Sequence, residues 1–253
     1  MKKTLVYIIS FLLLGFSTNI HAQTSVKDSL VTVPLNIRLG IDVSGPIIYA
    51  INRESIYYEG FASVDYNEKI SFALNAGYAK NIISKYQYDY EASGIYFKSG
   101  IDYNILKPQL SQGAYWAGIG VRYGISAFSF ESSNIKYSDI WGTTTFSLPS
   151  ERRLAHFLEI NSGFQANVTK HLTLGWRISL SKILYSGSKK DIKPIMVPGY
   201  GNRENGVSLG FKYYVGINFS YKKIKAKYKE GDSGANYDVL EETDPNTDSS
   251  RMF

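Results

Sequence analysis

The segment VSLGFKYYVGINFSY, residues 207–221, has an apolar or aromatic residue at every odd-numbered position. The even-numbered positions between them include Ser208, Lys212 and Asn218. A period of two indicates a β-strand whose two faces meet different surroundings. The segment is longer than the five or six residues usual for strands of soluble sheets. It suits a tilted membrane strand, which needs about 9–11 residues to cross the hydrocarbon.

Seven further segments alternate in the same way, at residues 37–43, 56–66, 70–78, 95–105, 115–125, 158–168 and 172–180. The links at 67–69, around 107–108 and at 169–171 are short, whereas those at 46–54, 80–93, 129–153 and 184–205 are long. Alternating link lengths are typical of outer-membrane barrels with short periplasmic turns and long outer loops. We therefore predict an all-β, antiparallel, up-and-down transmembrane β-barrel of about eight strands, with both termini in the periplasm.

The N-terminus has the features of a secretory signal peptide. Lys2 and Lys3 precede an apolar run from Leu5 to Phe16, and Ala22 is a small residue suited to cleavage. The run is shorter than the ~20 residues of a membrane helix, so a membrane anchor is the less favoured alternative. We expect a signal peptide at 1–22, a periplasmic N-terminal segment at 23–33, a barrel at 34–221 and a charged periplasmic tail at 222–253, in a protein of the cell outer membrane.

Composition narrows the class of protein. The 21 tyrosines favour surfaces that are apolar on one side and wet on the other, as at membrane interfaces. The chain has no cysteine, which excludes disulfides and thiolate metal sites. The tail joins a lysine run at 222–229 to an acidic stretch at 230–248, a composition that predicts disorder. Acidic residues beside the lysines would compete with phosphate, so nucleic acid is not an expected partner.

The inward face of the predicted strands carries balanced charges. The cations are Arg38, Lys98, Arg122, Arg177 and Lys212, and the anions are Asp42, Glu59, Asp65, Asp102 and Glu159. Eight strands leave an interior just wide enough for side chains. An unpaired charge there would cost several kcal/mol, whereas paired charges are tolerable. The set therefore predicts a charge network that plugs the lumen. A pore or ligand site built from the same residues, and a soluble two-sheet sandwich, remain as alternatives.

The signal peptide, alternating strands, charged inner face, long links and aromatic last strand together resemble the small barrels of the OmpA transmembrane-domain and OmpX type. The abundance of tyrosine is most similar to small barrels of Bacteroidota envelopes. The resemblance covers residues 34–221 and lies in the architecture, so it transfers no functional residues. Barrels of this type often end at a terminal aromatic residue. Here the barrel is expected to end near Phe219 or Tyr221, with about 30 residues following.

Catalytic and metal-binding patterns are weak. Lipid A-modifying barrels need a histidine close to a serine and a carboxylate. His21 leaves with the signal peptide, His171 lies in a predicted turn, and His156 is predicted to face lipid. The glycines of 118–124 lie inside a predicted strand and do not open a helix, as a nucleotide loop would. We expect no catalytic residue, no metal and no cofactor.

The predicted loop 129–153 contains Tyr137, Trp141 and Phe146, a density of aromatic residues that indicates a folded or partner-covered loop and makes these three a possible partner surface. The expected surroundings are outer-membrane lipid and lipopolysaccharide, with envelope proteins as partners. The leading hypothesis is a non-enzymatic structural or docking subunit of an envelope complex. A narrow channel or small-ligand-binding barrel, and a lipid A-modifying enzyme, are the alternatives.

Overall fold

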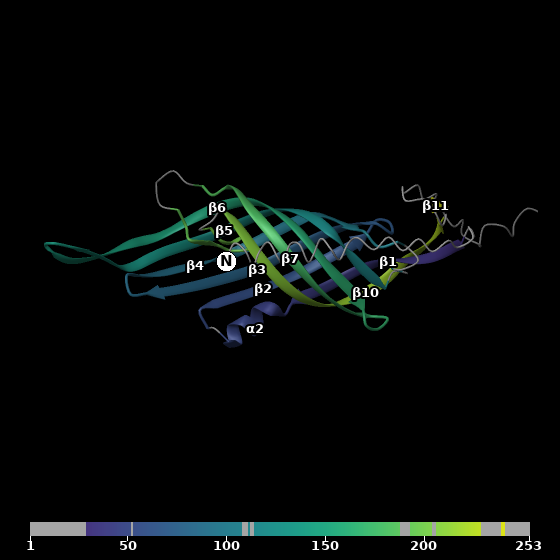
Figure 1. Ribbon diagram of the computed structural model, residues 1–253, viewed down its shortest axis with the longest axis horizontal. Helices are drawn as coiled ribbons and strands as arrows, with labels where there is room; N and C mark the ends of the chain where they lie inside the picture. Colours follow the sequence, from purple (N-terminus) through teal and green to yellow (C-terminus); the bar gives the residue numbers. More distant parts are fainter. Residues whose placement is uncertain are drawn as a thin grey trace, which may run out of the picture.

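The computed structural model is a closed barrel of eight antiparallel strands (Figure 1). It describes residues 29–51, 53–107, 111, 114–187, 193–203, 206–228 and 239–240. The barrel strands are β1 (Ser29–Asp42), β2 (Ser55–Asp65), β3 (Ile70–Lys85), β4 (Tyr88–Asn104), β5 (Tyr115–Asp139), β6 (Gly142–Asn167), β7 (Leu172–Tyr185) and β10 (Val207–Tyr228). Each strand pairs with the next, and β10 returns to pair with β1. The predicted all-β barrel is confirmed.

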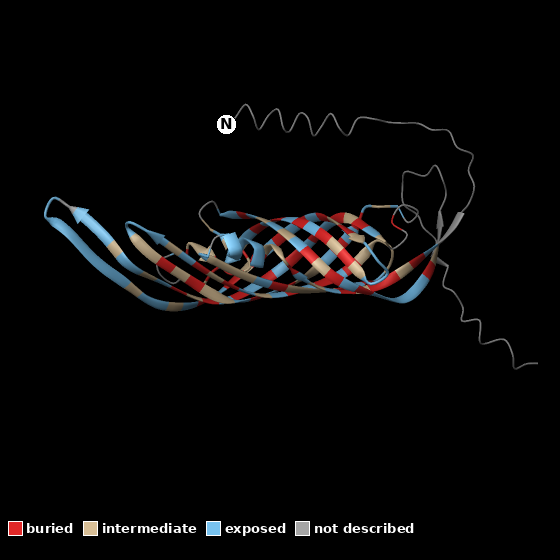
Figure 2. Cartoon of the chain, turned by 90° about the horizontal axis from the view of Figure 1, so that it is seen from below, coloured by how far each residue is buried: buried red, intermediate tan, exposed pale blue. Residues whose placement is uncertain are grey.

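Burial alternates along the strands in step with the sequence pattern. On β5, for example, Ile119 is 51% exposed and Arg122 is 2% exposed. Figure 2 shows buried and exposed residues alternating along the tilted strands. The apolar side chains form the outside and the charged ones fill the inside, the reverse of a soluble barrel in water. The outside of the barrel is therefore suited to lipid.

The short links form tight turns at the end of the barrel that we name the short-turn end. Asn67 Oδ1 accepts hydrogen bonds from the backbone N–H groups of Lys69 (2.9 Å) and Ile70 (2.7 Å). Thr169 Oγ1 accepts one from the N–H of Leu172 at 3.0 Å. Such side-chain caps satisfy backbone donors that the strands leave unpaired. Both turns lie where the sequence predicted them.

The opposite end, which we name the long-link end, differs from the prediction in two places. Links 80–93 and 129–153 are not loops, because β3 and β4 continue to Lys85 and Tyr88, and β5 and β6 continue to Asp139 and Gly142. The β5–β6 hairpin projects well beyond the rest of the barrel (Figures 1 and 2). In the β5–β6 extension no described residue of 131–152 is buried, so the apolar–polar alternation that identifies a membrane strand disappears there. In the β3–β4 extension the inward face stays covered, since Asn81, Tyr90 and Ala92 are buried.

The other two long links contain secondary structure of their own. The first holds the helix α2 (Ser44–Ile51), and the last holds the small hairpin of β8 (Met196–Val197) and β9 (Gly201–Asn202). None of the helices in the described ranges is long and apolar enough to cross a membrane.

The closing strands run past the predicted barrel limits of 34–221. β1 begins at Ser29 and β10 ends at Tyr228, so residues 222–228 belong to a strand and not to a tail. The strand β11 (Val239–Leu240) pairs with β10 at Lys225 and Ala226. The predicted signal peptide, residues 23–28 of the N-terminal segment and the remainder of the predicted tail lie outside the described residues.

Candidate functional site in the lumen

Three groups of charged side chains follow one another along the lumen. The first, nearest the short-turn end, is an arginine–carboxylate pair. Arg38 Nη1 and Nη2 donate to Asp65 Oδ1 and Oδ2 at 2.6 and 2.8 Å, a bidentate geometry. Asp65 also accepts from the Ser71 hydroxyl (2.7 Å) and from the backbone N–H of Asn36 (3.0 Å). Every oxygen of this buried carboxylate is therefore occupied.

The second group places two arginines on one carboxylate. Arg122 Nη2 and Arg177 Nη2 each lie 2.9 Å from Asp102 Oδ2. The Arg177 guanidinium also lies 5.1 Å from the centre of the buried Trp116 ring, a cation–π distance. A Cβ at Gly120 would meet Asp102 Oδ1 at 2.0 Å, so glycine makes room for this carboxylate. At this position the absence of a Cβ leaves the space that the charged side chain fills.

The third group is centred on Glu59, whose side chain is 1% exposed. Its carboxylate accepts hydrogen bonds from Asn75 Nδ2 (2.8 Å) and from the hydroxyls of Tyr96 (2.8 Å) and Tyr214 (3.0 Å). Lys212 Nζ also donates to Glu59. The sequence reasoning missed the two tyrosines, although their strand parity places them inside the barrel.

Lys98 completes this third group. Its ammonium lies 2.6 Å from Glu159 and 3.6 Å from Glu59, and the lysine is 1% exposed. Nine of the ten charged residues singled out in the sequence therefore lie in ion pairs. The exception is Asp42, which is buried and accepts hydrogen bonds from the backbone N–H (2.8 Å) and the hydroxyl (2.5 Å) of Ser44.

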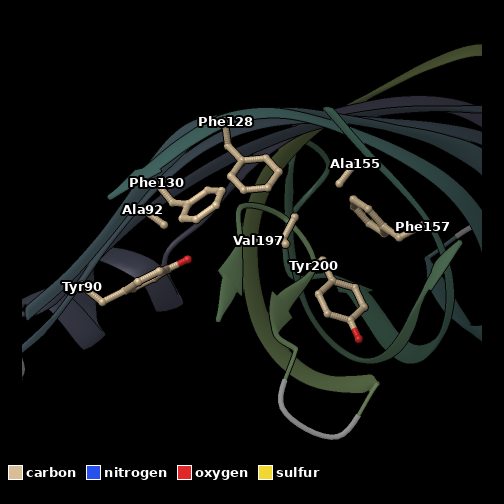
Figure 3. Close-up of a cluster of buried hydrophobic side chains, with 8 residues drawn as sticks. All are labelled: Tyr90, Ala92, Phe128, Phe130, Ala155, Phe157, Val197 and Tyr200. Carbon is tan, nitrogen blue, oxygen red and sulfur yellow. The ribbon is translucent and has the colours of Figure 1, made fainter. Parts of the chain in front are cut away.

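A hydrophobic cluster closes the lumen near the long-link end, and the sequence analysis did not foresee it. We name it the mouth cluster, and Figure 3 shows its eight residues: Tyr90, Ala92, Phe128, Phe130, Ala155, Phe157, Val197 and Tyr200. Val197 and Tyr200 come from the β7–β10 link, which folds onto the barrel mouth. The Tyr90 hydroxyl accepts hydrogen bonds from the N–H groups of Ile195 (3.1 Å) and Met196 (3.3 Å), which fixes this link to β4.

His156 and Glu159 lie on opposite sides of β6. His156 lies on the outward side of β6, and its Nδ1 is 2.7 Å from the Tyr123 hydroxyl, whereas Glu159 points into the lumen. The histidine and the carboxylate therefore cannot act together. Among the described side chains, no group of three or more histidine, aspartate or glutamate residues is placed to hold a metal ion.

The three aromatic residues predicted as a partner surface all lie on the projecting hairpin. Tyr137 is 63% exposed, Trp141 88% and Phe146 47%, and Ile140 beside them is 91% exposed. None of these four residues belongs to the mouth cluster, and Figure 2 shows the projecting hairpin mostly in the colour of exposed residues. The hairpin thus carries apolar side chains into solvent at the long-link end.

Comparison with known proteins gives one family and several barrels. The model of a family described as a domain of unknown function, DUF6048, matches residues 4–223. Solved structures with a similar barrel include Ail, the attachment invasion locus protein of Yersinia pestis (TM-score 0.39, 11% identity, 74% of this chain and 99% of that one). Another is Neisserial surface protein A (TM-score 0.34, 11% identity, 77% of this chain and 99% of that one). A third is CarO2 of Acinetobacter baumannii (TM-score 0.38, 11% identity, 75% of this chain and 99% of that one). No curated protein matches the chain.

Proposed function

The chain belongs to the DUF6048 family, and we propose that it is a non-enzymatic outer-membrane barrel that docks an envelope protein through its β5–β6 hairpin. The observation that carries this proposal is the hairpin tip. Ile140 and Trp141, in the turn between β5 and β6, are 91% and 88% exposed, and this hairpin projects beyond the rest of the barrel (Figure 2). Large apolar side chains gathered on a water-facing projection favour a protein contact.

The backbone of the same hairpin supports this role. Residues 142–148 of β6 pair with β5, whereas pairing of β6 with β7 begins only at His156 and Tyr185 within the described residues. Among the described strands, none is therefore paired to the other edge of residues 142–148. An exposed edge of this kind accepts an additional strand from a partner. Pro149 lacks an N–H group and sets the inner limit of the usable edge.

The lumen supports docking over transport. Its charged side chains form ion pairs with one another. The cavity near Trp116 and Arg38 at the short-turn end has a volume of only about 20 Å³. The mouth cluster fills the other end. A channel would need a continuous wet path, and a lipid A-modifying enzyme would need a histidine aligned with a carboxylate, so these alternatives receive less support.

The proposed orientation places the short-turn end and both termini in the periplasm and the hairpin outside the cell. The chain has no cysteine, so single cysteines can report which end is exposed. A membrane-impermeant maleimide applied to intact cells is expected to label Ile140→Cys and not Lys170→Cys, a substitution in the short turn after β6. Labelling only of Lys170→Cys would reverse the orientation and contradict the docking proposal.

The docking role is tested by crosslinking in intact cells followed by gentle extraction of the tagged, full-length protein and mass spectrometry. The test variants are Ile140→Ser and Trp141→Ser. The matched control is Tyr86→Ser, which removes a side chain that is 86% exposed at the neighbouring β3–β4 hairpin. We expect a stoichiometric envelope protein that is lost from both test variants and retained by the control. A lone barrel, or equal losses in all three variants, would refute the proposal.

A further inference from the structure

A separate cavity of about 320 Å³ lies at the seam of the barrel wall, and we name it the seam cavity. Its wall includes α2, the inner residues Asp42, Tyr96, Lys98 and Lys212, and Tyr200 of the mouth cluster. Small-molecule pockets begin at about 300 Å³, so this volume is that of a small ligand site. The docking function proposed above does not involve this cavity.

The seam cavity exists because β1 ends early. The last pair between β1 and β10 joins Asp42 to Tyr214, and the last pair between β1 and β2 joins Ile41 to Gly60. Beyond these pairs no described strand lies between the facing edges of β10 and β2, and α2 contacts both strands there. α2 lies so close to β2 that a Cβ at Gly45 would meet a β2 backbone oxygen at 2.1 Å.

The cavity reaches the outer surface of the wall as well as the lumen. Ile48 of α2 and Leu209 and Phe211 of β10 belong to its lining and are 44%, 75% and 58% exposed. On the inner side the lining ends at Lys98, which is 1% exposed. The seam cavity therefore joins an apolar outer rim to a polar floor.

The charges of the floor exclude a strongly charged ligand. Lys98 and Lys212 line the cavity, but both ammonium groups are bound to Glu59, and Lys98 is bound to Glu159 as well. Asp42 adds a further negative charge to the lining. Because each cation already has a carboxylate partner, an anion gains no net attraction. A cation would find only Asp42, whose Oδ1 already accepts two hydrogen bonds from Ser44.

Uncharged hydrogen-bonding groups are plentiful around the cavity. The serines Ser44, Ser179, Ser181 and Ser208 line it. A hydroxyl both donates and accepts, so these groups suit a ligand that is itself rich in hydroxyls. The rings of Tyr57, Tyr96 and Tyr200 supply aromatic faces in the same lining. Aromatic walls with a few convergent polar groups are the usual composition of small-molecule sites.

The Tyr200 hydroxyl gives an independent sign of a ligand. Tyr200 is 4% exposed, and its hydroxyl has no hydrogen-bond partner in the part of the chain that the structure describes. Figure 3 shows this hydroxyl pointing away from the other rings of the mouth cluster. A buried hydroxyl without a partner is costly for the fold, so a ligand that supplied the missing hydrogen bond would be bound favourably.

We propose that the seam cavity binds an uncharged, hydroxyl-rich group, a sugar, with the Tyr200 hydroxyl among its hydrogen-bond partners. The same chemistry has two sources. A free oligosaccharide would bind through its hydroxyls alone, whereas the sugar head of a glycolipid would also place its acyl chain against Ile48, Leu209 and Phe211.

Binding is measured calorimetrically with the full-length barrel in phosphatidylcholine nanodiscs, free of glycoside detergent. The probes are a panel of neutral mono- to trisaccharides, the same sugars carrying a short alkyl chain, and sulfated disaccharides. Tyr200→Phe removes only the unpartnered hydroxyl, and Tyr137→Phe removes a hydroxyl from the hairpin as the control. We expect about a tenfold loss of affinity in Tyr200→Phe, the usual effect of one hydrogen bond, and no loss in Tyr137→Phe.

Thermal unfolding separates a ligand role from a structural one. If the hydroxyl serves a ligand, Tyr200→Phe unfolds at the same temperature as the wild type or higher, because no hydrogen bond is lost from the fold. Binding of the free sugars identifies a soluble ligand, and binding of the alkylated sugars alone identifies a glycolipid head. Absence of binding to any neutral sugar, preference for sulfated sugars, or equal affinity of Tyr200→Phe and the wild type would each overturn the proposal.

Discussion

Replacing Glu59 by glutamine is the sharpest test of the plugged lumen. The Glu59 carboxylate accepts a hydrogen bond from the Lys212 ammonium. It also accepts hydrogen bonds from three neutral side chains, those of Asn75, Tyr96 and Tyr214. Glutamine keeps the size of the side chain but removes its charge and turns one acceptor into a donor. Breaking a buried pair from one side costs about 3–5 kcal/mol. We expect Glu59→Gln to lower the free energy of unfolding by that amount.

The chain offers a matched control for this substitution. Glu91 forms an ion pair with Lys80 at 2.6 Å on the outward side of the wall, with side-chain exposures of 37% and 30%. Exposed pairs contribute about 0–1 kcal/mol, so Glu91→Gln is expected to have almost no effect. Both variants lose one carboxylate, and only the position differs.

Urea unfolding in lipid vesicles measures both effects. Fluorescence of the buried Trp116 and the heat-modifiable mobility of the folded barrel report unfolding, and the midpoint and slope give its free energy. A double-mutant cycle with Lys212→Met isolates the ion pair from the rest of the carboxylate's contacts. Equal, small losses in Glu59→Gln and Glu91→Gln would mean that water solvates the lumen charges, and the argument for a plugged barrel would fail.

Three further predictions follow from the packing. Gly100→Ala is expected to abolish or sharply reduce the yield of folded, heat-modifiable barrel, because its Cβ would lie 1.9 Å from a backbone oxygen of β5. The control Gly60→Ala is expected to fold normally, because the nearest atom to its Cβ would be 3.7 Å away. Phe157→Ala is expected to cost about 3–5 kcal/mol in the same urea assay, because the ring is fully buried in the mouth cluster; a cost below 1 kcal/mol would show that the cluster does not hold the mouth closed. The wild-type barrel is expected to show no ion conductance in planar bilayers, and a steady conductance that changes in Arg177→Gln would favour the channel alternative.

The membrane-spanning part of the fold could be predicted from the sequence because each strand separates lipid from a polar interior. That separation imposes the period of two, and parity then assigns each charge to the inside. Nine of the ten charges accordingly lie in ion pairs, although parity could not give the partners. Which side chains meet depends on strand register and on the tilt of the barrel, which a single strand does not encode.

The sequence did not predict the strand extensions or the mouth cluster, which lie where the strands no longer separate lipid from a polar interior. Residues 131–139 and 142–147 form strands with solvent on both faces, so no apolar–polar alternation marks them. The sequence did contain an indication of the mouth cluster. Phe128 and Phe130 are at even-numbered positions of β5, like the inward-facing Arg122, and apolar side chains inside the barrel require an apolar partner. The partner is the β7–β10 link, and its inward fold depends on contacts remote in sequence, such as that of Tyr90 with Ile195 and Met196.

The pairing of β1 with β10 has a consequence for how this molecule comes to exist. Ser29 lies opposite Tyr228, so the contact that closes the barrel joins residues about 200 positions apart. No shorter fragment has a wall without open edges, and an open edge cannot persist in lipid. We therefore expect the barrel to close only once β10 is available to pair with β1. The seam cavity lies where the pairing of β1 with β10 ends.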